Sequence, residues 1–229
     1  MRISAAIQTH PSRTLMAEEL RGCIGGAEIV YDPDPGDRPS AWRTYRRALA
    51  ETPPDASHRL IVQEDAIVCD HLLEGLELAA AARPGRILVL FVAGTPIEHV
   101  RQVERARAAG HSWAELSFVR QWLPVVAVCW PAALTADVVA FADRQYELGR
   151  WPAAFCADDE ICGRFLRDRG MTALASVPSL VEHPDLEWSI ASTGRRGGTG
   201  KDAGRRAHVF IEDLGICDAR EVDWTLGPA

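Results

Sequence analysis

Short apolar runs alternate with helix-like segments along the first half of the chain. Apolar runs at residues 2–8, 27–31 and 59–63 predict strands, and a helix-like segment follows each of them. Parallel neighbours in a sheet need a long crossover, which a helix normally supplies, so this alternation favours a mostly parallel sheet covered by helices. The expected fold class is therefore α/β, with a mixed and mostly parallel sheet.

The rest of the chain continues the pattern less regularly. Residues 86–92 (RILVLFV) form a continuous apolar run that fits a strand buried on both faces. Further expected strands are 116–119, 124–129, 171–177 and, near the end, 208–211. Expected helices are 14–21, 40–50 (capped by Ser40), 70–82, 98–109, 135–144 and 158–169. No linker divides the chain, so residues 1–229 are expected to form one domain, with a flexible basic loop at 192–206 and a tail at 207–229.

Composition excludes several classes of protein. With 229 residues, 47% of them hydrophobic and 25% charged, the chain has ordinary globular composition. Its formal net charge of −7 argues against a broad surface for nucleic acid or anionic membrane. The six cysteines include no CxxC pair, which argues against a zinc ribbon. The start is too polar for a signal peptide, and the longest apolar stretch, 123–134, is too short for a membrane span, so a cytoplasmic protein is expected.

The sharpest motif is LIVQEDA, residues 60–66, in which an apolar strand ends in Glu64 and Asp65. Ligands of open α/β sheets bind at the carboxyl ends of the strands. Two acids at that edge indicate either a Mg²⁺ or Mn²⁺ site, because these ions prefer oxygen ligands, or a pair of turn and capping residues.

Two further features could contribute to a site at this edge. Asp158 and Asp159 open a helix, where acids either complement the helix dipole or serve as a general base. His183 follows PSLVE and is either a surface residue or, together with Asp65, part of a mixed carboxylate and imidazole metal site.

Basic and polar residues that could bind a nucleotide surround these acids. The loops after the first two strands leave the same sheet edge that carries the acidic pair. Their polar residues are Thr9, His10, Arg13, Asp32 and Asp34. A glycine-rich stretch with two arginine pairs, ending in Arg205 and Arg206, is either a solvated loop or a basic lid over phosphate. The chain lacks GxGxxG, Walker, GxSxG and HExxH motifs, so dinucleotide oxidoreductases, P-loop ATPases, α/β-hydrolases and zincins lose their main support.

Taken in order, these features resemble a glycosyltransferase of the GT-A fold, a Rossmann-like single domain. The stretch HRLIVQEDAIVCDHLLEGL is similar to the segment with the acidic metal motif in bacterial and phage-encoded members, and the resemblance spans about residues 2–211. Gln63 stands where the DxD form of that motif has its first acid.

The resemblance implies a transferase that moves a sugar from a nucleotide diphosphate sugar to an acceptor hydroxyl with Mn²⁺ or Mg²⁺. Asp65 and His183 would bind the metal, and Glu64 would support it or contact the ribose. Asp159 would be the general base, and Asp158 would bind the acceptor or donor sugar. The nucleoside pocket and the lid would take the remaining residues: Thr9, His10, Arg13, Asp32, Asp34, Arg205 and Arg206.

The acceptor and two other readings stay open. The resemblance implies as acceptor a modified DNA base, as in phage members of such families, or equally a glycan, a lipid-linked acceptor or a small molecule. A phage-encoded enzyme would work in the host cytoplasm. A nucleotidyltransferase uses a related architecture with similar acidic metal sites. A non-catalytic nucleotide-binding or structural protein on the same fold would use the acids as caps.

Overall fold

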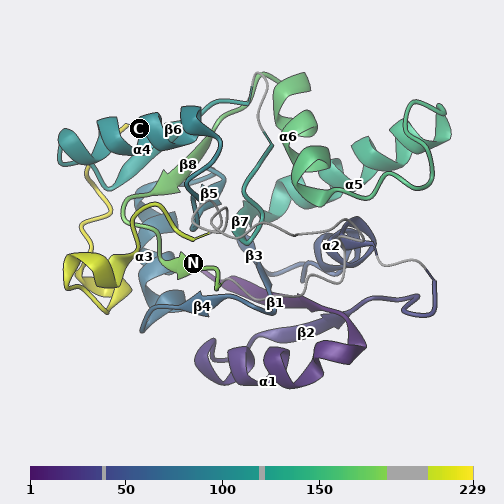
Figure 1. The fold of residues 1–229 in the computed structure, drawn as a ribbon, viewed down its shortest axis with the longest axis horizontal. Helices are drawn as coiled ribbons and strands as arrows, with labels where there is room; N and C mark the ends of the chain where they lie inside the picture. The colour runs from purple at the N-terminus through teal and green to yellow at the C-terminus, as the bar shows by residue number, and fades with distance from the viewer. Residues whose placement is uncertain (38–39, 119–121, 185–205, 229) are drawn as a thin grey trace, which may run out of the picture.

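The computed structural model describes residues 1–37, 40–118, 122–184 and 206–228. Within these residues, a seven-stranded sheet has the order β2-β1-β3-β7-β5-β8-β6 (Figure 1). Its strands are β1 (Ile3–Thr9), β2 (Glu28–Tyr31), β3 (His58–Gln63), β5 (Leu88–Val89), β6 (Trp113–Leu116), β7 (Ala127–Pro131) and β8 (Ala173–Ser176). Strands β7 and β6 run against the other five, so the sheet is mixed and mostly parallel, as predicted.

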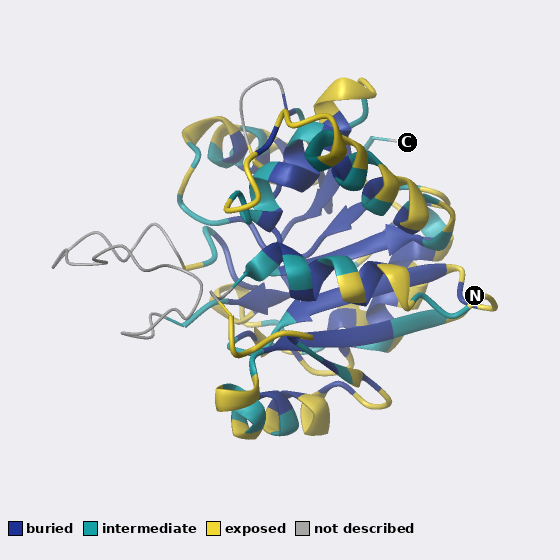
Figure 2. Ribbon diagram, turned by 90° about the vertical axis from the view of Figure 1, so that its right-hand side faces the viewer, coloured by how far each residue is buried: buried dark blue, intermediate teal, exposed yellow. Residues whose placement is uncertain are grey.

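Helices cover both faces of this sheet (Figure 2). They are α1 (Thr14–Cys23), α2 (Ala41–Ala50), α3 (Leu72–Ala82), α4 (Ile97–Ala108), α5 (Ala132–Glu147) and α6 (Asp158–Asp168). Side chains of a strand point alternately to opposite faces, so β1 contributes Ala6 to a core with α2, α5 and α6, and Ile7 to a core with α1 and α3. The sheet is therefore buried on both sides, which fits its continuous apolar runs.

The first three strands place the loops of interest at one edge. Strand β1 pairs in parallel with both β2 and β3, and Gln8 of β1 lies opposite Val30 and Gln63. The chain therefore leaves these three strands on the same side of the molecule. A small antiparallel pair of β4 (Ile67–Val68) and β9 (Val181–Glu182) brings the residues after β3 beside those that precede His183.

The strand predicted at residues 86–92 is shorter than expected. Only Leu88 and Val89 belong to a regular ladder, as β5. The backbone N–H of Leu90 still donates to Ala127, but its carbonyl accepts hydrogen bonds from Leu180 and Val181 instead of continuing beside β8. The apolar run predicts the burial correctly, but these distant partners decide where the regular strand ends.

The C-terminal residues are more ordered than a tail. The strand predicted at 208–211 is a single bridge between Phe210 and Ser179, followed by a 3-10 helix, η3 (Ile211–Leu214). A second short helix, η4 (Ala219–Glu221), lies beside α3 (Figure 1). Trp224 is buried against Trp113, with ring centroids 4.9 Å apart. The flexible loop expected at 192–206 lies, apart from Arg206, outside the described residues, and the single domain stays a prediction.

Within the described residues, no helix has both the length and the apolar character needed to cross a bilayer.

Candidate functional site

The acidic pair after β3 is held by an arginine from the loop after β1. Nη1 of Arg13 lies 2.8 Å from Oε1 of Glu64 and 3.2 Å from Oδ2 of Asp65. Arg13 ends a 3-10 helix, η1 (Pro11–Arg13), and its backbone N–H donates to the carbonyl of His10. Because β1 and β3 are parallel neighbours, residues 51 and 52 positions apart in the sequence meet at this edge.

His183 lies on the other side of Asp65. Its Nε2 is 3.5 Å from Oδ1 of Asp65, and its ring is beside Phe91, with centroids 6.1 Å apart. Asp65 therefore has one oxygen toward Arg13 and the other toward His183. The sequence analysis expected Asp65 and His183 to meet, and the fold brings them together although 118 positions separate them in the sequence.

Burial of Arg13, Glu64, Asp65 and His183 disfavours an uncompensated charge among them. Burial, and then the neighbouring charge of Asp65, raises the pKa of Glu64, while the hydrogen bond from Arg13 acts in the opposite direction. Side chains of all four residues are 12–13% exposed. A carboxylate pair that is this deeply set needs a positive partner nearby, and Arg13 supplies one.

Asp158 begins α6 on the other face of the sheet edge. Its Oδ1 accepts a hydrogen bond from the backbone N–H of Asp159 at 3.0 Å. Burial, followed by the neighbouring charge of Asp159, raises the pKa of Asp158 to about 7, and a hydrogen bond from the Gln8 side chain opposes this shift. Asp158 is thus a buried carboxyl beside the end of β1, with its proton held near neutral pH.

Asp159 is more open to solvent than Asp158. Its Oδ1 accepts from the backbone N–H of Glu160 at 2.7 Å, and burial raises its pKa above the usual range. The next acid, Glu160, forms an ion pair with Arg164 one turn along the helix. The first turn of α6 thus holds one buried, one partly exposed and one ion-paired acid.

The acids after β2 have their own partners. Arg43 of α2 donates to both oxygens of Asp32, at 2.6 and 2.9 Å, and to the carbonyl of Asp34 at 2.6 Å. Burial alone would raise the pKa of Asp32, but the hydrogen bonds from Arg43 and from the Asp34 backbone lower it. Asp34 presents an exposed side chain, so of these two acids it is the more accessible to a ligand.

Thr9 and His10 shape the turn after β1. The carbonyl of Thr9, a buried residue, accepts from the backbone N–H of Asp32, which ties the first two loops together. Nδ1 of His10 accepts from the backbone N–H of Ser12 and caps η1.

Arg206 forms an ion pair with Glu182, a buried acid that directly precedes His183. Its Nε is 3.6 Å from Oε2 of Glu182, while Oε1 of Glu182 accepts from the backbone N–H groups of His183 and Ala207, both at 2.7 Å. Arg205, also predicted to contact the donor, lies outside the described residues.

Polar atoms without hydrogen-bond partners concentrate at this edge. Of the ten such buried side-chain atoms in the described residues, four belong to site residues: Oε1 of Gln8, Oδ1 of Asp65, Oδ2 of Asp158 and Nδ1 of His183. Buried polar groups are normally paired, so such a concentration marks a place where a ligand or solvent completes the bonding. No three His, Cys, Asp or Glu side chains of the described residues form a metal-binding group by themselves.

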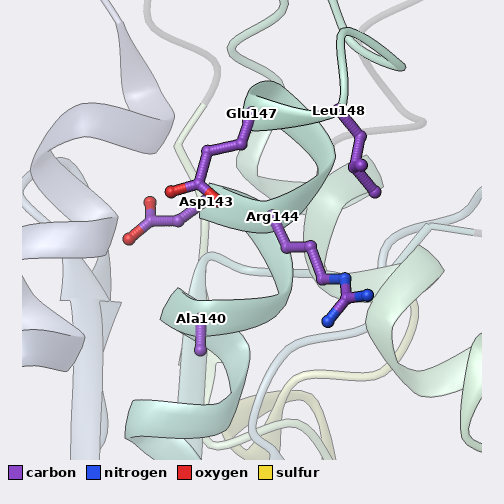
Figure 3. Close-up of a pocket in the computed structure, with 5 residues that line it drawn as sticks. All are labelled: Ala140, Asp143, Arg144, Glu147 and Leu148. Carbon is purple, nitrogen blue, oxygen red and sulfur yellow. The ribbon is translucent and has the colours of Figure 1, made fainter.

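A hollow elsewhere in the molecule has a different character. It is about 480 Å³, lies along the C-terminal half of α5, and is lined by Ala140, Asp143, Arg144, Glu147 and Leu148 (Figure 3). Asp143 within it forms an ion pair with Arg46 of α2 at 2.7 Å. None of its five lining residues belongs to the cluster of acids at the carboxyl ends of β1 and β3.

Sequence reasoning missed Gln8, Arg43 and Glu182. Gln8 had a signal, since it is a polar residue that directly follows the apolar residues 5–7 of β1, on the face of the strand that carries Ala6. Arg43 and Glu182 had none, because Arg43 binds an acid in the loop after β2 and Glu182 also binds the backbone of Ala207, 25 positions further along the chain.

Comparisons with known proteins address the fold. No protein-family model matches the chain, and no curated protein sequence matches it. Among solved structures, S. aureus TarS (residues 1–349, with UDP-GlcNAc) matches at 12% identity and a TM-score of 0.53, covering 85% of this chain and 61% of that one. The chain has a GT-A-like fold.

Two further matches have lower TM-scores. Drosophila β-1,4-galactosyltransferase 7, with manganese, UDP-Gal and xylobiose, matches at 7% identity and a TM-score of 0.49, covering 91% of this chain and 82% of that one. CMP:2-keto-3-deoxy-manno-octonic acid synthetase, with CTP, matches at 11% identity and a TM-score of 0.43, covering 76% and 89%. The GT-A-like fold rests on the match to TarS, which at 12% identity shows the fold and not the activity.

Proposed function

We propose that the chain is a glycosyltransferase that uses a nucleotide diphosphate sugar and a divalent cation. One observation carries this proposal. In this GT-A-like fold, buried polar atoms without hydrogen-bond partners lie at or beside the carboxyl ends of β1 and β3. They belong to Gln8, Asp65, Asp158 and His183. That edge is where α/β sheets bind ligands.

The residues around Asp65 fit a divalent cation. Oδ1 of Asp65 has no hydrogen-bond partner, and Nε2 of His183 lies 3.5 Å from it, so a carboxylate oxygen and an imidazole nitrogen face one point. Mn²⁺ accepts both ligand types, and Mg²⁺-like ions are commonly held by one or two protein ligands plus substrate phosphates. When bound, the cation supplies positive charge next to the oxygens of the leaving diphosphate.

The acids of α6 fit the acceptor half of the reaction. An acceptor hydroxyl is a poor nucleophile at neutral pH, and a carboxylate held near it removes its proton as the hydroxyl attacks. Asp159 is the better base, because it is partly exposed, whereas Asp158 is buried and holds its proton to about pH 7. Asp158 and Gln8 then form a polar floor under the sugar.

The test is a thermal-shift screen of UDP, GDP, CDP and dTDP, each with and without Mn²⁺. A ligand at about 100 times its dissociation constant stabilises the folded state by roughly 2.7 kcal/mol, which is visible as a shift in Tm. We expect one nucleotide to raise the Tm, and to raise it further with Mn²⁺. Asp65→Ala should lose the Mn²⁺-dependent part.

The variant Asp137→Ala on α5 is the control, because its side chain is exposed and forms its ion pair with Arg169, outside the proposed site. No shift with any nucleotide would contradict the proposal and favour a structural protein. A larger shift with a nucleoside triphosphate than with the matching diphosphate would favour a nucleotidyltransferase.

A further inference from the structure

Arg13 neutralises the two carboxylates on which the cation would depend. One nitrogen, Nη1, serves both Glu64 and Asp65, at 2.8 and 3.2 Å. The side chains are 12% exposed, so the charges interact with weaker solvent screening than on an open surface. In the free protein, therefore, the acidic pair already has a positive partner.

The backbone of Arg13 is fixed, whereas its side chain has many rotatable bonds. Its backbone N–H donates to the His10 carbonyl at the end of η1, and α1 begins at the next residue. Movement of the guanidinium toward another anion then requires rotation about side-chain bonds and an exchange of its present contacts, without a change in the backbone.

A cation at Asp65 would lie beside this guanidinium. Asp65 uses Oδ2 for Arg13 and has Oδ1 without a hydrogen-bond partner toward His183. The two oxygens belong to one carboxylate, so a divalent ion on Oδ1 would be close to the positive charge on Oδ2. Like charges at this separation repel, and the carboxylate charge that attracts the ion is already shared with Arg13.

We propose that Arg13 and the divalent cation compete for the Glu64–Asp65 pair, so that the free protein binds the cation weakly and binds it tightly only together with the donor's diphosphate. This inference rests on the proposed function. The diphosphate brings negative charge that offers Arg13 a partner in place of the carboxylates, because guanidinium groups bind phosphate oxygens well. Arg13 is thus a positioning residue that makes cation and donor binding interdependent.

The test measures Mn²⁺ affinity from the electron paramagnetic resonance signal of free Mn²⁺, with and without each of the four nucleoside diphosphates. We expect Arg13→Gln to bind Mn²⁺ alone at least tenfold more tightly than the original chain. In Arg13→Gln, the nucleotide should increase the Mn²⁺ affinity by a smaller factor than it does in the original chain. The variant Arg13→Lys keeps the positive charge, so it should bind Mn²⁺ alone as weakly as the original chain does.

Arg21→Gln is the matched control, since it removes one positive charge from exposed α1 and should leave both affinities unchanged. Arg13→Met is a second neutral variant, which serves if Arg13→Gln does not fold. Equal or weaker Mn²⁺ binding by the neutral variants would overturn the inference, as would the absence of Mn²⁺ binding in every protein tested.

The two proposals fail in different ways. Tighter Mn²⁺ binding by Arg13→Gln with no nucleotide binding by any protein would support the competition and contradict the proposed donor. Nucleotide binding that Mn²⁺ strengthens equally in the original chain and in Arg13→Gln would support the donor and contradict the competition.

Discussion

Asp158 and Asp159 are neighbours in the sequence but have different surroundings. Asp158 points toward Gln8 and the core, and its pKa is raised to about 7, whereas Asp159 is partly exposed. Two adjacent carboxyls with different proton affinities suit different roles, one as a neutral polar contact and the other as a base.

The buried carboxyl predicts a pH-dependent stability. In the unfolded chain Asp158 has an ordinary pKa near 3.8, and in the folded chain about 7. Below about pH 4 the carboxyl is protonated in both states; between pH 4 and 7 only the unfolded chain loses the proton, so the folded state loses stability as pH rises. Asp158→Asn should remove this loss, a gain that grows to roughly 4 kcal/mol near pH 8.

Urea denaturation of this variant and the original chain at pH 4, 5.5, 7 and 8 checks the expectation. The exposed Asp137 on α5, changed to Asn, serves as the control. A stability difference that stays constant over this range would show that Asp158 is ionised in the folded chain.

The proposed role of Asp159 as general base predicts that its substitution affects transfer and not donor binding. Asp159→Asn should slow sugar transfer by 10²-fold or more, because a lost general base costs on the order of 10²–10⁴ in rate, while donor affinity stays unchanged. Glu160→Gln is the control, as it makes the same charge change one residue along and its side chain pairs with Arg164. Full transfer by Asp159→Asn would exclude it as the base.

For single residues, the sequence predicted those whose side-chain type and motif indicate a chemical role. It did not predict residues that matter only because of their contacts in the folded chain. Asp65 and His183 could be proposed as a pair because each follows a recognisable motif. Arg43 could not be proposed, because nothing near it in the sequence shows that it donates to both oxygens of Asp32.

Among the elements, α3 depends on a glycine at its contact with η4. A Cβ at Gly75 would lie 2.3 Å from the Cβ of Ala219 and 2.8 Å from its backbone carbon and oxygen. The close approach of α3 to η4 therefore requires a residue without a side chain at this position. Because backbone atoms are involved, rotation of a side chain cannot relieve the contact.

This contact predicts opposite effects for two similar substitutions. Gly75→Ala should destabilise the protein by about 1–3 kcal/mol through overpacking, although alanine favours helix. Gly22→Ala in α1 meets no atom within 4 Å and should be neutral or stabilising by up to about 1 kcal/mol. Chemical denaturation of the two variants measures the difference, and equal effects would show that α3 and η4 are not in tight contact.

The elements themselves were predictable where local signals dominate. The Ser40 cap of α2 is confirmed, since its side chain accepts from the backbone N–H of Arg43. The extent of β5 was not predictable, because it depends on the hydrogen bonds that Leu90 makes with residues 127, 180 and 181.

For the molecule as a whole, the C-terminal residues complete the core. Nε1 of Trp113 donates to the carbonyl of Trp224 at 3.0 Å, and Oγ of Ser112 donates to the carbonyl of Asp223 at 2.7 Å. Arg83, after α3, donates to the carbonyls of Thr225 and Gly227. These bonds join the end of the chain to β6 and α3, which no local pattern in the sequence indicated.

Trp224 should therefore matter for global stability. Trp224→Ala should lower the free energy of unfolding by about 3–5 kcal/mol, as expected when a large aromatic side chain is removed from a core. Trp122→Ala is the matched control, because that tryptophan is 43% exposed, and its effect should stay within about 0.5 kcal/mol. Urea denaturation distinguishes the two, and a small effect at Trp224 would mean that the C-terminal residues pack loosely.

Glu182 accepts hydrogen bonds from the backbone at two points of the chain, His183 and Ala207. One carboxylate oxygen therefore joins the points where the chain leaves the core and where it returns. Because both backbone N–H groups depend on this one oxygen, a single substitution at Glu182 would leave two distant points of the chain without their acceptor.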